Sequence, residues 1–224
     1  GKWEERTGSG DGELDRPSGM VFDADDNLYI VDSGNHRVQK FNKDGKYLAQ
    51  FGTYGSGDGQ FDMPWGIGID AENNVYIADW RNDRIQKFAP DGSFLMAFGE
   101  SGSEDGQFNR PADVAVDKEG LIYVADWRND RVQVFDAEGR FITEIIGDAT
   151  LSKWGITKLD ANPDMKMQRD IAQGLEREKF LRGPMGVVVD DQDQVFIVDS
   201  QRNRIQIYRK IPPFFVGLYD GGRL

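Results

Sequence analysis

The stretch PWGIGIDAENNVYIADWRNDRIQKF, residues 64–88, decides the fold, because the chain repeats its pattern in four copies. In every copy an Asp lies six residues after the first proline, a second Asp follows nine residues later, and an Arg stands five residues beyond that. The copies match without gaps over 25 residues. Such a match establishes an internal repeat, the feature that sets the architecture of a chain. The copies begin at Pro17, Pro64, Pro111 and Pro184.

Each copy has the pattern of antiparallel strands. NVYIAD is a short β-branched and aromatic run, the acidic DAENN before it is typical of a hairpin turn, and DRIQKF alternates apolar and polar residues. A second turn, APDGS, leads to a fourth strand, FLMAFG. Four strands in about 47 residues are typical of a propeller blade. The sequence therefore predicts an all-β propeller in a single domain, residues 1–224, with blades near residues 17–52, 64–99, 111–147 and 184–218.

The conserved spacing within the copies resembles that of a known family. The pattern Asp-x-x-Asn-x-Arg-(Val/Ile)-Gln, with NHR at Asn35–Arg37, is similar to the NHL repeat, as is the linker GSGDGQF at Gly55–Phe61. The resemblance implies an NHL-type β-propeller. It implies function only loosely, since relatives include protein- and RNA-binding modules, sensor domains and an amidating lyase. Two departures are RNR at Arg202–Arg204 and Asp113, which replaces a Gly.

The number of blades leaves ring closure open. The resemblance implies six blades, and four copies are present. The chain could belong to a longer six-bladed protein, Lys2–Thr7 could close a four-bladed ring by completing the last blade, or chains could associate to finish a ring. An open arc would leave apolar blade faces bare. We favour a six-bladed ring, truncated or completed by a partner, with the four-bladed ring as the rival.

A helical insertion is expected between the third and fourth blades, at about residues 148–182. The spacing of the second aspartates grows there from 47 to 73 residues. Asn162 is typical of an N-cap and Pro163 of the first helical position. Met167, Ile171 and Leu175 form a stripe at helical spacing, which predicts docking on the propeller, with a partner surface or a lid over the tunnel as alternatives.

Composition limits the function classes. The net charge of −12 argues against a nucleic-acid binder and against adsorption to anionic lipid, and no apolar run could span a membrane. The chain has no cysteine and one histidine, so several histidines cannot share a metal. No nucleophile elbow or phosphate loop is present. We therefore predict no catalytic residue, no metal and no cofactor.

The repeated charges are interpreted as scaffold. The Asp and Arg of each copy are expected to pair across two strands, because partly buried charges need partners. The acidic turns lack the Gly and the final Glu of a calcium loop, so they are interpreted as hairpin turns. These pairs are Asp32–Arg37, Asp79–Arg84, Asp126–Arg131 and Asp199–Arg204.

Function is expected where the copies differ. The loop between the second and third strands and the linker between blades should share one rim, and residues after each first proline should face the tunnel mouth. Trp–Arg pairs suit recognition because both residue types are enriched at interaction hot spots. The alternative for the indoles is packing on the neighbouring blade. The predicted binding residues are His36, Trp65, Trp80, Arg81, Trp127, Arg128, Met185 and Arg202.

These observations predict a non-catalytic scaffold that binds a protein or peptide through the rim that carries the insertion. Self-association to complete the ring is a further possibility. The alternative is a small-molecule enzyme, amidating-lyase-like or lactone-hydrolase-like as the resemblance implies, with a metal in the central tunnel. A stoichiometric bound divalent ion would favour that alternative.

Overall fold

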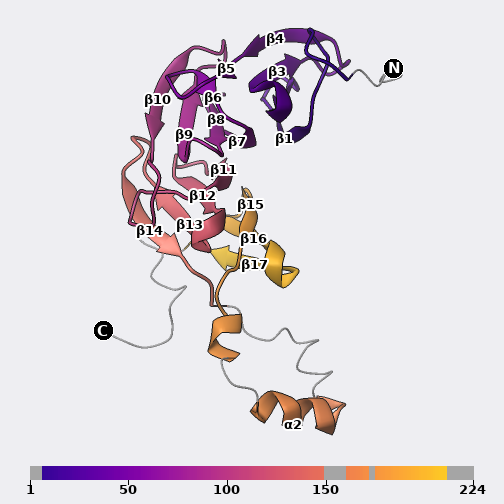
Figure 1. Cartoon of the computed structure of the whole chain (residues 1–224), viewed down its shortest axis with the longest axis vertical. Helices are drawn as coiled ribbons and strands as arrows, with labels where there is room; N and C mark the ends of the chain where they lie inside the picture. The colour runs from indigo at the N-terminus through magenta and orange to yellow at the C-terminus, as the bar shows by residue number, and fades with distance from the viewer. Residues whose placement is uncertain (1–6, 149–159, 172–174, 211–224) are drawn as a thin grey trace.

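A computed structural model describes residues 7–148, 160–171 and 175–210 as four blades of antiparallel strands (Figure 1). The sheets join consecutive strands in chain order, so each blade is a meander. The predicted all-β propeller, with a helix between the third and fourth blades, is confirmed. The first blade comprises β1 (Pro17–Phe22), β2 (Leu28–Asp32), β3 (Arg37–Phe41) and β4 (Tyr47–Phe51), and the second β7 (Pro64–Ile69), β8 (Val75–Asp79), β9 (Arg84–Phe88) and β10 (Phe94–Phe98). The third comprises β11 (Pro111–Val116), β12 (Ile122–Asp126), β13 (Arg131–Phe135) and β14 (Phe141–Ile145), and the fourth β15 (Pro184–Val189), β16 (Gln194–Asp199) and β17 (Arg204–Arg209).

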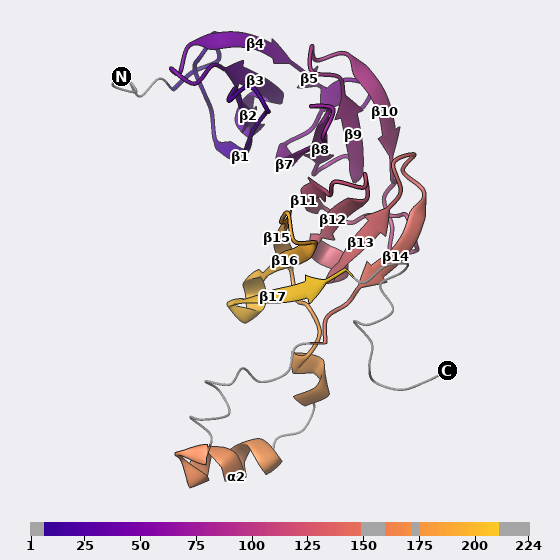
Figure 2. The same cartoon turned by 180° about the vertical axis from the view of Figure 1, so that it is seen from behind.

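The blades form an open arc. Their first strands, β1, β7, β11 and β15, lie side by side along its inner edge, and the first and fourth blades stand apart at its two ends in both views (Figures 1 and 2). Of the segment Lys2–Thr7 that could close a four-bladed ring, only Thr7 is described, and it forms a parallel bridge with Leu14. The second linker has the same form, since β5 (Thr53–Tyr54) pairs in parallel with β6 (Gln60–Phe61).

The apolar core lies between neighbouring blades. Tyr29 and Val31 of the first blade are buried against Ile77 and Phe88 of the second. Strand residues alternate between the two faces of a blade, so one set packs against the preceding blade and the other against the next. Each blade therefore needs a neighbour on both sides to bury its side chains.

The acidic turns hold their hairpins by local hydrogen bonds. The Asp70 carboxylate accepts from the backbone N–H groups of Glu72 and Asn74 at 3.1 and 2.8 Å. Asp23 makes the equivalent bonds to Asp25 and Asn27. This is the chemistry by which Asp favours turns, and it agrees with the interpretation of these segments as hairpin turns.

The insertion contains the predicted helix, α2 (Pro163–Ile171), followed by a short turn of helix, η3 (Leu175–Glu178). The N-cap prediction is confirmed, because the Asn162 side chain accepts from the Met165 N–H at 3.3 Å. Docking of the helical stripe is wrong for its two described side chains: Met167 and Ile171 are 57% and 70% exposed. A nine-residue helix with few apolar side chains offers little area to bury, and α2 stands away from the blades (Figure 1).

Candidate binding surface

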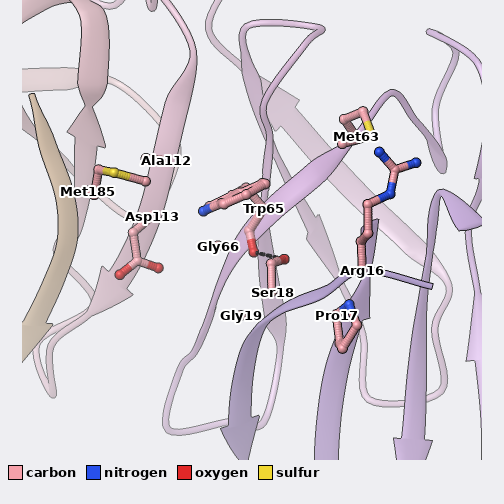
Figure 3. Close-up of a pocket in the computed structure, with 10 residues that line it drawn as sticks. All are labelled: Arg16, Pro17, Ser18, Gly19, Met63, Trp65, Gly66, Ala112, Asp113 and Met185. Atoms are coloured by element: carbon pink, nitrogen blue, oxygen red, sulfur yellow. Dashed lines mark hydrogen bonds between the residues drawn. The ribbon is translucent and has the colours of Figure 1, made fainter. Parts of the chain in front are cut away.

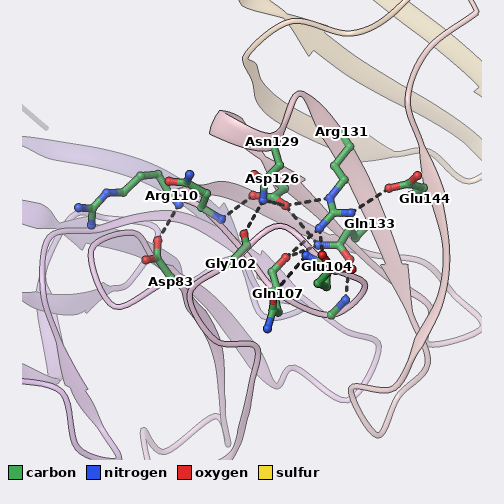
Figure 4. A network of polar contacts seen from close by, with 12 residues as sticks. Asp83, Gly102, Glu104, Gln107, Arg110, Asp126, Asn129, Arg131, Gln133 and Glu144 are labelled. Carbon is green, nitrogen blue, oxygen red and sulfur yellow. Dashed lines mark hydrogen bonds and ion pairs between the residues drawn. The ribbon is translucent and has the colours of Figure 1, made fainter.

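A buried carboxylate ties each linker to its blade, as the third blade shows (Figure 4). Asp126 is fully buried, and one of its oxygens accepts from Asn129, Arg131 and Gln133 at 2.8, 3.0 and 3.2 Å. Its other oxygen accepts from the Asn109 backbone N–H at 2.8 Å. Burial raises the pKa of Asp126, and these donors counteract part of that effect. The carboxylate is saturated by scaffold contacts.

The same ion pair recurs in all four blades, so the predicted structural role of the repeated Asp and Arg is confirmed. The guanidinium Nε lies within ordinary hydrogen-bond distance of a fully buried carboxylate each time. The Arg–Asp distances are 2.7 Å for Arg37–Asp32, 2.9 Å for Arg84–Asp79, 3.0 Å for Arg131–Asp126 and 2.7 Å for Arg204–Asp199.

A second repeated contact joins neighbouring blades and includes His36. This residue has a left-handed backbone, and its Nδ1 accepts from the Met63 N–H, just before the next blade's first proline, at 3.1 Å. His36 also packs edge-on against Tyr54, with ring centroids 4.8 Å apart. We call these contacts the blade clamps; they are Met63 to His36, Arg110 to Asp83 at 2.7 Å and Gly183 to Asp130 at 2.7 Å.

The structure brings the residues after the four first prolines together around one cavity on the inner side of the arc. The cavity has a volume of about 700 Å³. The Trp65 indole extends across it towards Ala112 and Met185, and Arg16 and Met63 lie on the opposite side (Figure 3). The Ser18 hydroxyl donates to the Trp65 carbonyl at 2.6 Å. Ser18, Trp65, Ala112 and Met185 therefore line one cavity on the inner side of the arc.

Three indoles form a continuous row beside this cavity. Trp80 lies between Trp65 and Trp127, with ring centroids 6.0 Å from each and the rings tilted rather than parallel. All three side chains are half-buried. Trp80 and Trp127 therefore pack on each other across neighbouring blades, as the packing alternative expects, and all three indoles keep part of their surface in solvent. We call Trp65, Trp80 and Trp127 the tryptophan row.

Arginines flank the row. Arg81 and Arg110 lie over the Trp80 ring at 5.9 and 5.2 Å, and Arg128 lies over Trp127 at 5.3 Å. These distances suit cation–π contact. Arg81 and Arg128 are exposed. The sequence-based prediction missed Arg110. The residue before the first proline differs among the copies, as Arg16 and Met63 show, and this variation could have marked it.

Asp113, which lines the cavity, is a second residue that the prediction of binding residues missed. It stands where the other copies have Gly, so only its departure from the repeat marked it. Its carboxylate accepts from the Val187 backbone N–H at 3.0 Å, which links β11 to β15. Burial raises the pKa of Asp113 to about 7.

Arg202, unlike the other predicted residues, anchors the insertion. Its guanidinium donates to the Arg177 carbonyl in η3. The neighbouring Arg204 donates to the Phe180 carbonyl at 2.9 Å. The end of the insertion thus takes the place that linkers occupy in other blades, where Arg84 contacts Gln60. This part of the predicted rim is covered by the chain itself.

Within residues 7–148, 160–171 and 175–210, no three His, Cys, Asp or Glu side chains are grouped so that they could hold a metal ion. No helix in the same ranges is long and apolar enough to cross a membrane.

Comparison with known proteins gives similarity at two levels. The family model of the NHL repeat matches residues 14–41, 61–88, 108–135 and 181–208, half of the chain. RING finger protein nhl-1 of Caenorhabditis elegans is 47% identical over 49 residues, which are 22% of this chain and 5% of that protein. The match thus spans a small part of that relative.

Solved structures share the architecture. A chain of a nidogen/laminin complex is 18% identical with a TM-score of 0.55, over 86% of this chain and 64% of that one. A catalytically inactive virginiamycin B lyase from Staphylococcus aureus, solved with quinupristin, is 12% identical with a TM-score of 0.53, over 88% and 56%. At these identities the likeness shows the fold alone.

Proposed function

This chain belongs to the family of NHL-repeat proteins, and on that premise we propose that it is a non-catalytic scaffold that binds a protein or peptide. The binding surface is the tryptophan row together with the mouth of the adjoining cavity. The observation that carries the proposal is the series of three half-buried indoles with arginines over two of them. Such large, rigid side chains present contact area at a low cost in conformational entropy.

The repeat scaffold does not require this row. The Asp and Arg of each blade and the blade clamps recur in copies without tryptophan, so these contacts already hold the blades together. Trp80 and Trp127 are replaced by Ser33 and Ser200 in the first and last copies. The row is thus a feature of the second and third blades that blade construction leaves unexplained.

The charges beside the row define the ligand more closely. Arg81 and Arg128 are exposed, and Arg16 lines the cavity with a side chain that is 67% exposed. Arg81 and Arg16 lie 3.8 and 3.6 Å from the carboxylates of Asp62 and Asp15, and each guanidinium has further N–H donors that a ligand could use. We propose that the bound segment carries acidic side chains, which pair with these arginines, and an apolar residue that lies on the indoles.

Exposed arginines give the clearest test, because replacing half-buried indoles would also affect stability. A random peptide display library would be panned on the immobilised chain, and affinities of the enriched peptides measured by fluorescence anisotropy. We expect sequences rich in Asp or Glu whose affinity falls roughly tenfold or more in the Arg81→Ala/Arg128→Ala variant. The matched control is Arg140→Ala, an exposed arginine in the turn between β13 and β14.

Two results would contradict the proposal. Enriched peptides that bind the double variant as tightly as the unaltered chain would place recognition elsewhere. Tight, salt-dependent binding of an oligouridine that requires the same arginines would instead make the surface an RNA site, since aromatic rings and arginines also suit single-stranded bases.

A second candidate function, a small-molecule enzyme of the lyase or lactone-hydrolase kind, has one observation in its favour. Asp113 lines the cavity, and a carboxyl with a pKa of about 7 can act as a general acid or base near neutral pH. Elemental analysis after exhaustive dialysis tests the metal-dependent form: less than one bound divalent ion per chain would contradict it.

A further inference from the structure

The two ends of the arc expose apolar side chains that the inner blades bury. On the first blade these are Met20 and Phe22 of β1, which we call the first end face. On the fourth blade they are Val188, Val198, Ile205 and Ile207, which we call the last end face. Both lie on the outermost blades of the open arc (Figures 1 and 2).

Equivalent residues in the other blades are buried against a neighbouring blade, which shows the kind of surface that the end faces fit. Met20 is 61% exposed, whereas its counterparts Val114 and Val187 are 1% and 2% exposed against the preceding blade. Ile205 is 61% exposed, whereas its counterpart Val132 is completely buried against the next blade. The end faces are thus the two complementary halves of an interface that the chain already makes between each pair of neighbouring blades.

The blade clamp is also left half-made at each end. Arg16 occupies the position of Met63 and Arg110, and its backbone N–H has no acceptor among the described residues. Asn203 occupies the position of His36 and Asp83, with the same left-handed backbone, and its side chain has no hydrogen-bond partner within residues 7–148, 160–171 and 175–210. Among the described residues, the Arg16 N–H is therefore a donor without an acceptor at one end of the arc, and the Asn203 side chain is an acceptor without a donor at the other.

We propose that the last end face of one copy of this chain receives the first end face of a second copy. The apolar surfaces would continue the inter-blade core, and Asn203 of one copy would accept from the Arg16 N–H of the other. A second copy fits because it offers both halves of the interface in the register that the internal blades use. The contact is head to tail, so it builds a ring where the rotation closes and an open chain where it does not.

Each end face can be blocked separately, which gives a test specific to a head-to-tail contact. Sedimentation velocity over a range of protein concentrations should show assemblies larger than one chain. Met20→Lys blocks the first end face and Ile205→Lys the last, since a lysine ammonium would be buried there without a partner. Each variant alone should be monomeric, with association weakened by roughly tenfold or more. An equimolar mixture should form a dimer and stop, because only one pair of intact faces remains.

The control is Leu95→Lys, which charges a 49% exposed apolar residue on the outer strand β10 and should leave association unchanged. Raising the salt concentration should strengthen the assembly, because it screens the repulsion between chains of net charge −12. A monomer at every concentration would overturn the proposal. Association that survives both blocking substitutions, or a mixture that fails to dimerise, would overturn it as well.

Discussion

The indole of Trp80 packs at a tilt against that of Trp127, with ring centroids 6.0 Å apart, although the two residues lie in different blades. Both follow the last Asp of a second strand, in copies that spell the same pentapeptide, DWRND. Neighbouring blades place equivalent positions side by side, so a repeat in sequence becomes a row in space. Trp65, from the first strand of the second blade, extends that row to the cavity.

The middle indole should matter most to the row. Trp80→Phe alters both indole contacts, whereas Trp127→Phe alters one. We expect the near-ultraviolet circular dichroism of the indoles to change more in Trp80→Phe, and stability to fall by less than about 0.5–1.5 kcal/mol for each contact, because phenylalanine keeps an aromatic ring in the pair. Equal spectra for the two variants would mean that the indoles do not interact as a series in solution.

His36 should act as a hydrogen-bond acceptor in a left-handed turn. His36→Ala removes the bond to the Met63 N–H and places an alanine at φ 55°, so it should lower the free energy of unfolding by about 1–3 kcal/mol. His36→Asn keeps an acceptor and tolerates that backbone, as Asn203 does, so it should cost much less. Urea unfolding measures both; an equal loss for the two variants would contradict the blade clamp.

Removing the charge of Asp126 should destabilise the fold strongly. Asp126→Asn leaves the buried Arg131 guanidinium with the half-buried Glu144 carboxylate as its one remaining ion-pair partner among the described residues, so the loss should not exceed the roughly 3–5 kcal/mol typical of a broken buried ion pair. The matched control is Asp105→Asn in the exposed part of the same linker, which should stay within about 0.5 kcal/mol of the unaltered chain. A loss in Asp126→Asn no larger than in the control would contradict the structural role.

Asp113 should make stability fall as pH rises. Its pKa is about 7 in the folded chain and near its ordinary value of 3.8 in the unfolded chain. Between these values the folded state holds a proton that the unfolded state has lost, so the contribution of this group to stability declines from about pH 4 to about pH 7 and is then constant. Asp113→Asn should remove this part of the pH dependence. If the free energy of unfolding varies with pH in the same way for Asp113→Asn and for the unaltered chain, the prediction is wrong.

The strands and turns were predictable because their sequence pattern occurs in all four copies of the repeat. Pro64 begins an inner strand, Asp70 starts a hairpin turn, and Asp79 ends the second strand, in each case as the spacing predicts. Helix α2 was predictable from its cap at Asn162. Its exposed Ile171 was not, because periodicity shows which side of a helix is apolar and cannot show whether a partner is within reach.

The candidate site was predicted in part for a similar reason. Trp80 and Trp127 were recognisable as departures from the repeat, but their contact depends on how one blade lies on the next. Arg202 was likewise recognisable as a departure from the repeat. Only the path of the insertion shows that its side chain binds the backbone of η3.

The sequence by itself determined the blade: its four-fold pattern, its turn chemistry and its Asp–Arg pairs follow from local spacing and from the need of buried charges for partners. Only the tertiary structure decided what lies between blades. Contact between the indoles, the half-made clamps at Arg16 and Asn203 and the bare faces at Met20 and Ile205 depend on the position of one blade relative to another. That position results from packing between residues far apart in the chain, which a local pattern does not encode.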